Sequence, residues 1–138
     1  MGSVHDNINN ASIVISYTFG DVSIIFPGDI EPDGWANLRL RNTNLLETAR
    51  RSRTRILLAP HHGRWSGYSQ DLVDYISPHL VVISDGYGAG ETDARFRNAG
   101  LGLKVNGVAV KYVTTKNKGR KRITISDRGE VHVHEADM

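Results

Sequence analysis

The sequence has 138 residues, of which 39% are hydrophobic and 23% charged, the composition of an ordinary globular protein. It contains no cysteine, which excludes disulfide bonds and thiolate metal sites, so any metal ion must take His, carboxylate or water ligands. The net charge is only +2, and no apolar run is long enough for a membrane-spanning helix or a signal peptide core. We therefore expect a cytoplasmic protein without a membrane segment.

The first half of the chain predicts a loose polar leader over residues 1–10, a β-hairpin and two helices. Polar and apolar residues alternate before the turn Gly20-Asp21, and an apolar run follows it, which is typical of an antiparallel hairpin. The predicted elements are strands at 12–17 and 22–26 and helices at 35–41 and 43–51.

The second half predicts alternating strands and helices, followed by terminal β-strands. Ser69 can cap an amphipathic helix that Pro78 ends, and residues 80–83 are apolar on both faces, as in a central covered strand. The predicted elements are strands at 55–59 and 80–83, helices between 69 and 78 and at 93–98, and β segments at 108–114, 121–126 and 130–135. This order predicts an α/β fold with a mixed β-sheet and flanking helices, in one domain over residues 11–138.

Two polar clusters follow predicted strands. Gly28-Asp29-Ile30-Glu31 comes after the strand at 22–26, and Pro60-His61-His62-Gly63 comes after the strand at 55–59. Because strand ends can converge at one edge of a sheet, we expect Asp29 and the histidines to meet within a few ångströms. Taken alone, each motif is compatible with a turn or a loop cap, but together they favour a hydrolytic metal site.

These two motifs, with the segments at 10–15, 82–86 and 122–129, resemble the metallo-β-lactamase-fold hydrolase domain of ComEC-type competence (DNA-uptake) proteins. The resemblance covers nearly the whole chain and implies the C-terminal half of an αβ/βα sandwich. It also implies two divalent metal ions, zinc or manganese, whose bound water attacks a phosphodiester bond. In that scheme Asp29 is a metal ligand, and His61 and His62 are ligands, supporting residues or transition-state contacts.

The sequence departs from the family pattern in two places. The family motif His-x-His-x-Asp-His is absent, and the only His before Asp29 is His5. A later family His falls on Asp93, which can either replace it as a ligand for a hard metal or simply open a helix. One Asp and one or two His do not close a dinuclear site, so the metal could be absent from this chain alone.

The apolar character of the predicted strands indicates a companion. Residues 56–59 and 80–83 are apolar on both sides, so half of a sandwich would expose a large apolar face, which soluble monomers rarely tolerate. We therefore expect a second copy or a second protein chain over this face.

The segment 116–122 carries five of the seventeen basic residues and no acidic residue. It can bind phosphates of DNA or RNA, or it can be a solvated hairpin whose charges discourage edge pairing. The candidate nucleic-acid contacts are Lys116, Lys118, Arg120, Lys121 and Arg122.

Two functions are the main candidates, beside a plain basic nucleic-acid-binding domain as a third. The first is a metal-dependent hydrolase, or a subunit of one, that cleaves phosphodiester bonds of nucleic acid, with His61 and His62 as catalytic residues and Asp29, His61 and Asp93 as metal ligands. The second is a degenerate, non-catalytic module of the same fold that acts in binding or assembly. Metal content distinguishes the two.

Overall fold

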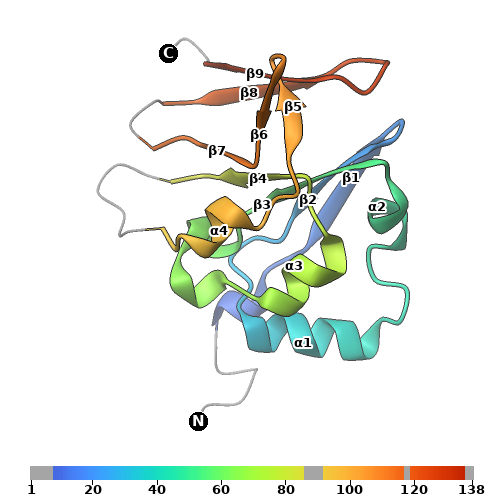
Figure 1. The fold of residues 1–138 in the computed structure, drawn as a ribbon. Coiled ribbons are helices and arrows are strands. Elements are labelled where there is room, and N and C mark those ends of the chain that lie inside the picture. Colours follow the sequence, from blue (N-terminus) through green and yellow to red (C-terminus); the bar gives the residue numbers. More distant parts are fainter. Residues whose placement is uncertain (1–7, 86–91, 117–118, 136–138) are drawn as a thin grey trace.

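The computed structural model describes residues 8–85, 92–116 and 119–135. This part of the chain forms two β-sheets, and helices lie on the side of the larger sheet that faces away from the smaller one (Figure 1). The predicted α/β class, with mixed strands and flanking helices, is confirmed. The second sheet was not predicted.

The larger sheet has five strands in the order β1-β2-β3-β4-β7. β1 (Ile15–Phe19) runs antiparallel to β2 (Val22–Phe26), and β2 is followed by three parallel neighbours. These neighbours are β3 (Thr54–Leu58), β4 (Leu80–Ile83) and β7 (Tyr112–Thr114). The carboxyl ends of four parallel strands therefore lie along one edge, the usual place for a ligand site in an α/β sheet. We call it the carboxyl edge.

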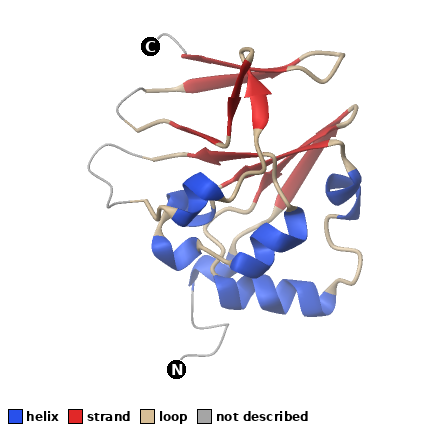
Figure 2. Cartoon of the chain, in the orientation of Figure 1, coloured by secondary structure: helices blue, strands red, loops and turns tan. Residues whose placement is uncertain are grey.

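The helices lie together on one face of this sheet (Figure 2). Two buried clusters join them to it, one around Trp35 and Leu57 and the other around Val81 and Phe96. In the described ranges, no helix has the length and apolar character needed to cross a membrane. The helices are α1 (Pro32–Arg41), α2 (Glu47–Arg51), α3 (Gln70–Ile76) and α4 (Arg95–Asn98), with short 3₁₀ turns η2 (Ile8–Ala11), η3 (Pro60–Gly63) and η4 (Trp65–Gly67).

The smaller sheet has the order β6-β5-β9-β8 and comes mainly from the C-terminal part of the chain. The prediction of one strand at 108–114 was wrong, because the chain bends at Lys111 and changes sheets there. The bend lets Val110 and Val113 both pack against the core between the sheets. The strands are β5 (Leu103–Val105), β6 (Val108–Val110), β8 (Lys121–Ile125) and β9 (Val131–Glu135).

The apolar face of the larger sheet is mostly covered by this second sheet. Val22, Ile56 and Leu80 are buried in one cluster with Val105 and Val131 of the smaller sheet. The expected exposure of the central strands was therefore wrong, because the chain supplies its own cover.

Strand β1 is the exception to this cover. All five of its residues are exposed, and the apolar row Ile15, Tyr17 and Phe19 is 54%, 59% and 45% exposed. This row lies at the edge of the sheet, where β2 is the one partner of β1 among the described strands. The apolar row that this face leaves exposed therefore lies on β1.

Candidate functional site

The loop after β2 holds Asp29 by contacts to the segment that precedes β1. Gly28 adopts a left-handed backbone with φ 63°, and a Cβ there would lie 3.1 Å from Cβ of Ser12. The backbone N–H of Asp29 donates to Oγ of Ser12 at 3.1 Å. Both the turn and the close approach therefore require glycine at position 28.

The loop after β3, turn η3, has an uncommon backbone. His61 and His62 are both left-handed, with φ 51° and 56°. For a residue other than glycine this conformation costs about 1–2 kcal/mol. The backbone N–H of His61 donates to the carbonyl of Gly28 at 3.0 Å, which ties this loop to the Asp29 loop. Such strain clusters at functional sites.

The imidazole of His62 lies between two groups at the carboxyl edge. Its Nδ1 is 3.0 Å from the carbonyl oxygen of Ser84, directly after β4, and its Nε2 is 3.7 Å from Oδ1 of Asp29. Because a carbonyl only accepts, Nδ1 carries the hydrogen in this contact, and Nε2 is the ring atom that faces the carboxylate. The predicted meeting of acid and imidazole is confirmed for His62.

His61 lies in the same turn but directs its ring elsewhere. Its Nδ1 is 3.1 Å from Oγ of Ser66 in turn η4. Gly67 permits this close packing, because a Cβ at position 67 would lie 2.4 Å from the carbonyl oxygen of Pro60. The sequence did not distinguish the two histidines, and the structure separates them by their partners.

Asp93 lies next to the histidine turn, but its carboxylate is occupied. Its backbone N–H donates to the carbonyl of Gly63 at 2.8 Å. Arg95 donates to Oδ1 from its backbone N–H and Nε, at 2.9 and 3.0 Å, and to Oδ2 from Nη2 at 2.8 Å. These hydrogen bonds hold the pKa of Asp93 below its ordinary value. Metal binding by Asp93 would first have to displace Arg95.

Asp85, which the sequence interpretation did not select, directly follows the segment that holds His62. Its side chain is 1% exposed and its Oδ2 has no hydrogen-bond partner in the described part of the chain. Among the described residues, the cation within 4 Å of this carboxylate is Lys116, whose Nζ is 3.8 Å from Oδ2. The rule that selected Asp29 and the histidines, a polar residue just after an apolar strand, also selects Asp85.

The predicted basic segment is divided between several environments. Lys116 follows β7 at the carboxyl edge, whereas Lys121 is only 11% exposed and binds Glu135 at 3.0 Å. Arg120 and Arg122 are exposed, and Arg122 lies on β8 opposite His134. Lys118 lies outside the described residues.

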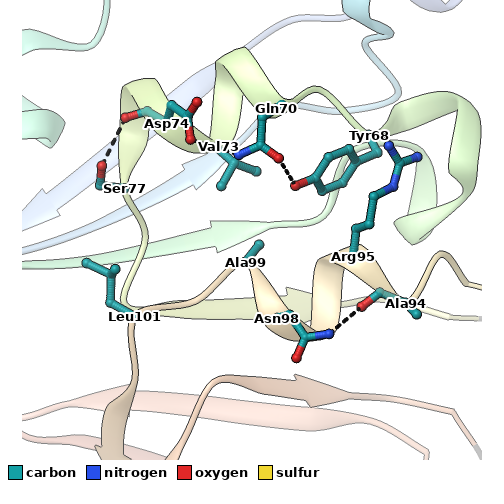
Figure 3. Close-up of a pocket in the computed structure, with 10 residues that line it drawn as sticks. All are labelled: Tyr68, Gln70, Val73, Asp74, Ser77, Ala94, Arg95, Asn98, Ala99 and Leu101. Atoms are coloured by element: carbon teal, nitrogen blue, oxygen red, sulfur yellow. Dashed lines mark hydrogen bonds between the residues drawn. The ribbon is translucent and has the colours of Figure 1, made fainter.

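A separate groove of about 500 Å³ lies between α3 and α4 (Figure 3). The hydroxyl of Tyr68 donates to Oε1 of Gln70 at 2.7 Å, and the guanidinium of Arg95 lies 4.1 Å from the Tyr68 ring centre. Burial raises the pKa of the Tyr68 hydroxyl above its ordinary value. Arg95 thus joins this groove to Asp93.

Within residues 8–85, 92–116 and 119–135, no three His, Cys, Asp or Glu side chains form a group that could hold a metal ion. No protein-family model matches the sequence, and neither does any curated protein or solved structure. The likeness to the metallo-β-lactamase fold therefore depends on the sequence motifs.

Proposed function

We propose that this chain is part of a metal-dependent hydrolase of the metallo-β-lactamase superfamily that acts on phosphodiester bonds of nucleic acid. The observation that carries the proposal is the contact of Asp29 with His62 at the carboxyl edge. Two loops after separate strands, one of them strained, bring these side chains together. A cytoplasmic location belongs to the same proposal, since the chain has no cysteine.

The two side chains fit two positions around one divalent ion. With metal–ligand bonds of about 2.1 Å, donors in tetrahedral geometry lie about 3.4 Å apart. The separation of 3.7 Å between Nε2 and Oδ1 is close to this value. Imidazole nitrogen and carboxylate oxygen also suit both zinc and manganese.

The second ring nitrogen of His62 supports this assignment. Histidines that bind metal usually donate the other ring N–H to a carbonyl or carboxylate, which fixes the tautomer and the ring orientation. The contact of Nδ1 with the Ser84 carbonyl has this form. It leaves Nε2 facing Asp29, an arrangement that favours a cation between the two atoms.

The remaining ligands would come from a companion. The described residues supply two converging ligands, and a closed site needs more. The exposed row on β1 is where we expect a second protein chain or a second copy to pack, because it is apolar and lies at an unpaired sheet edge.

The chemistry would be divided among the edge residues as follows. Bound divalent metal would lower the pKa of a water molecule to about 7 and polarise the phosphate. Asp29 and His62 would hold their positions as ligands, and Ser84 would keep the His62 ring oriented. The ring of His61 contacts Ser66 instead, so the catalytic role expected for His61 depends on the sequence motif alone.

A second candidate is a non-catalytic module of the same fold that acts in binding or assembly. The observation that favours it is the lack of a three-ligand group among the residues that the structure describes. In that case the polar carboxyl edge would be a remnant, and β1 would be the functional surface.

Metal titration separates the two candidates. Isothermal titration with zinc and with manganese would be performed on the chain alone and with a candidate companion. For a hydrolase, Asp29→Asn and His62→Asn should each weaken binding more than tenfold, as expected for loss of a ligand. His134→Asn is the matched control, because His134 is exposed on β9. If metal binds neither to the chain alone nor to the chain with its companion, the non-catalytic module is favoured.

A further inference from the structure

The end of β4 holds two side chains at the carboxyl edge. The carbonyl of Ser84 accepts from His62, and the carboxylate of the next residue, Asp85, lies 3.8 Å from the ammonium of Lys116. Two consecutive residues, Ser84 and Asp85, therefore link the start of the basic segment to His62, although the two are distant in sequence.

The backbone at this point is fixed by β7. The N–H of Asp85 donates to Oγ1 of Thr115 at 2.9 Å, and that hydroxyl donates back to the carbonyl of Asp85 at 2.8 Å. The N–H of Thr115 donates to the carbonyl of Ile83 at 3.1 Å. These bonds extend the parallel pairing of β4 and β7 beyond the strand ends. They fix the backbone of Asp85, from which its carboxylate extends.

A buried carboxylate with an unpartnered oxygen requires an explanation. Removing such a charge from water is costly unless a cation or hydrogen bonds compensate it. At 3.8 Å, the ammonium of Lys116 is too far from Oδ2 for a hydrogen bond, yet close enough for electrostatic attraction to the buried carboxylate. Asp85 is therefore suited to hold this ammonium in place without saturating it.

Lys116 remains available on its other side. Its side chain is 42% exposed. Its backbone N–H donates to Oγ1 of Thr114 at 3.1 Å, which fixes the start of the side chain. An ammonium group has three donors, so it can face Asp85 and still donate to a phosphate oxygen.

We propose that Asp85 is a positioning residue that holds Lys116 at the carboxyl edge, where the Lys116 ammonium contacts a phosphate of a bound DNA strand. The inference rests on the proposed function for the identity of the ligand. It also predicts the course of the bound DNA strand, which would pass from the basic segment toward His62.

The test measures binding of a short fluorescein-labelled single-stranded DNA by anisotropy over a series of salt concentrations in EDTA. Lys116→Ala should weaken binding several-fold and lower the slope of log K against log salt by about 0.7, the value for one phosphate contact in a single strand. Lys116→Arg should restore most of the slope. Lys111→Ala is the matched control, because Lys111 is exposed and precedes β7 at the opposite end of the strand.

Asp85→Asn tests the positioning role by the sign of its effect. Removing a negative charge ordinarily strengthens the binding of a polyanion. If Asp85 holds Lys116, this variant should instead weaken binding, and Lys116→Ala should cause a smaller loss in the Asp85→Asn background than in the wild type. Asparagine was chosen because its amide has nearly the shape of the carboxyl group. Thermal unfolding would confirm that the Asp85→Asn variant is folded.

Several results would overturn the inference. They are stronger binding by Asp85→Asn, equal effects of Lys116→Ala and Lys111→Ala, or no binding of the wild type at low salt. Because the assay contains no divalent metal, none of these depends on the ligands of the proposed hydrolase. If the variants bind DNA as expected but the titration shows no metal binding, the hydrolase proposal fails and the Lys116 site is retained.

Discussion

Turn η3 and helix α3 are close in the sequence, but they are stabilised in opposite ways. α3 follows local rules: Ser69 accepts from the N–H of Leu72 at 3.1 Å, and Leu72, Val73 and Ile76 are buried on one side. In η3, by contrast, two consecutive histidines adopt a left-handed backbone that their side chains disfavour. Local stability therefore explains the helix, whereas the proposed function supplies a reason for the turn, which directs the imidazole of His62 to the carboxyl edge.

The largest expected effect tests whether the buried apolar face of α3 stabilises the fold. Ile76 is 1% exposed and packs in the cluster with Trp35 and Leu57. Ile76→Ala should lower the free energy of unfolding by about 2–5 kcal/mol, because it removes buried methyl groups and leaves a cavity. Chemical denaturation gives the value, and Leu40→Ala, at an exposed position in α1, is the control. A loss below that of the control would show that α3 is not held by its apolar face.

This contrast explains how much of the molecule could be predicted from its sequence. The strands at 22–26 and 80–83 were predicted with the bounds observed, because both are short and consist mostly of apolar, β-branched or aromatic residues. The Ser69 cap was also predicted, because it depends on neighbouring residues alone. The second sheet could not be predicted, because β5 has only three residues and the change of sheet at Lys111 depends on packing.

The candidate site could be predicted only in part: its location followed from the sequence, but the contacts of its individual side chains did not. The rule that polar residues after parallel strands share an edge predicted correctly that Asp29 meets a histidine, His62. It could not choose between His61 and His62, because that choice depends on backbone angles and on Ser66 and Ser84. Nor could spacing reveal that Arg95 occupies the carboxylate of Asp93.

A smaller effect is expected at the start of α3. Ser69→Ala removes the oxygen that accepts from the N–H of Leu72 and should lower the free energy of unfolding by about 1 kcal/mol. Ser69→Asp keeps an acceptor at this position and should preserve most of the stability. Equal losses in both variants would indicate that the buried Ser69 contributes by packing and not by capping.

In the strained turn, unlike in a helix, substitution by glycine should give a more stable protein than substitution by alanine. His61→Gly relieves a left-handed backbone that His61→Ala retains, so the Gly variant should be more stable than the Ala variant by about 1 kcal/mol. Both variants lose the contact with Ser66, so their difference isolates the backbone. If urea denaturation places the two variants at the same stability, the turn is not strained at this residue.

The smallest effect is a pH dependence in the segment that follows α3. The N–H of Arg55 donates to Nδ1 of His79 at 3.0 Å, a contact that needs the unprotonated nitrogen. Burial, and then the charge of Arg55, lower the pKa of His79 below its ordinary value of 6.5. The folded state therefore binds a proton less readily than the unfolded state, so stability is full above about pH 6.5 and falls as the pH drops toward the folded pKa.

The variant His79→Asn tests this dependence, because asparagine can keep an acceptor for the Arg55 N–H without a titrating group. Its stability should change less between pH 7 and pH 5 than that of the wild type, as measured by thermal unfolding at each pH. An equal change in both proteins would assign the acid sensitivity to other groups and leave His79 as a packing residue.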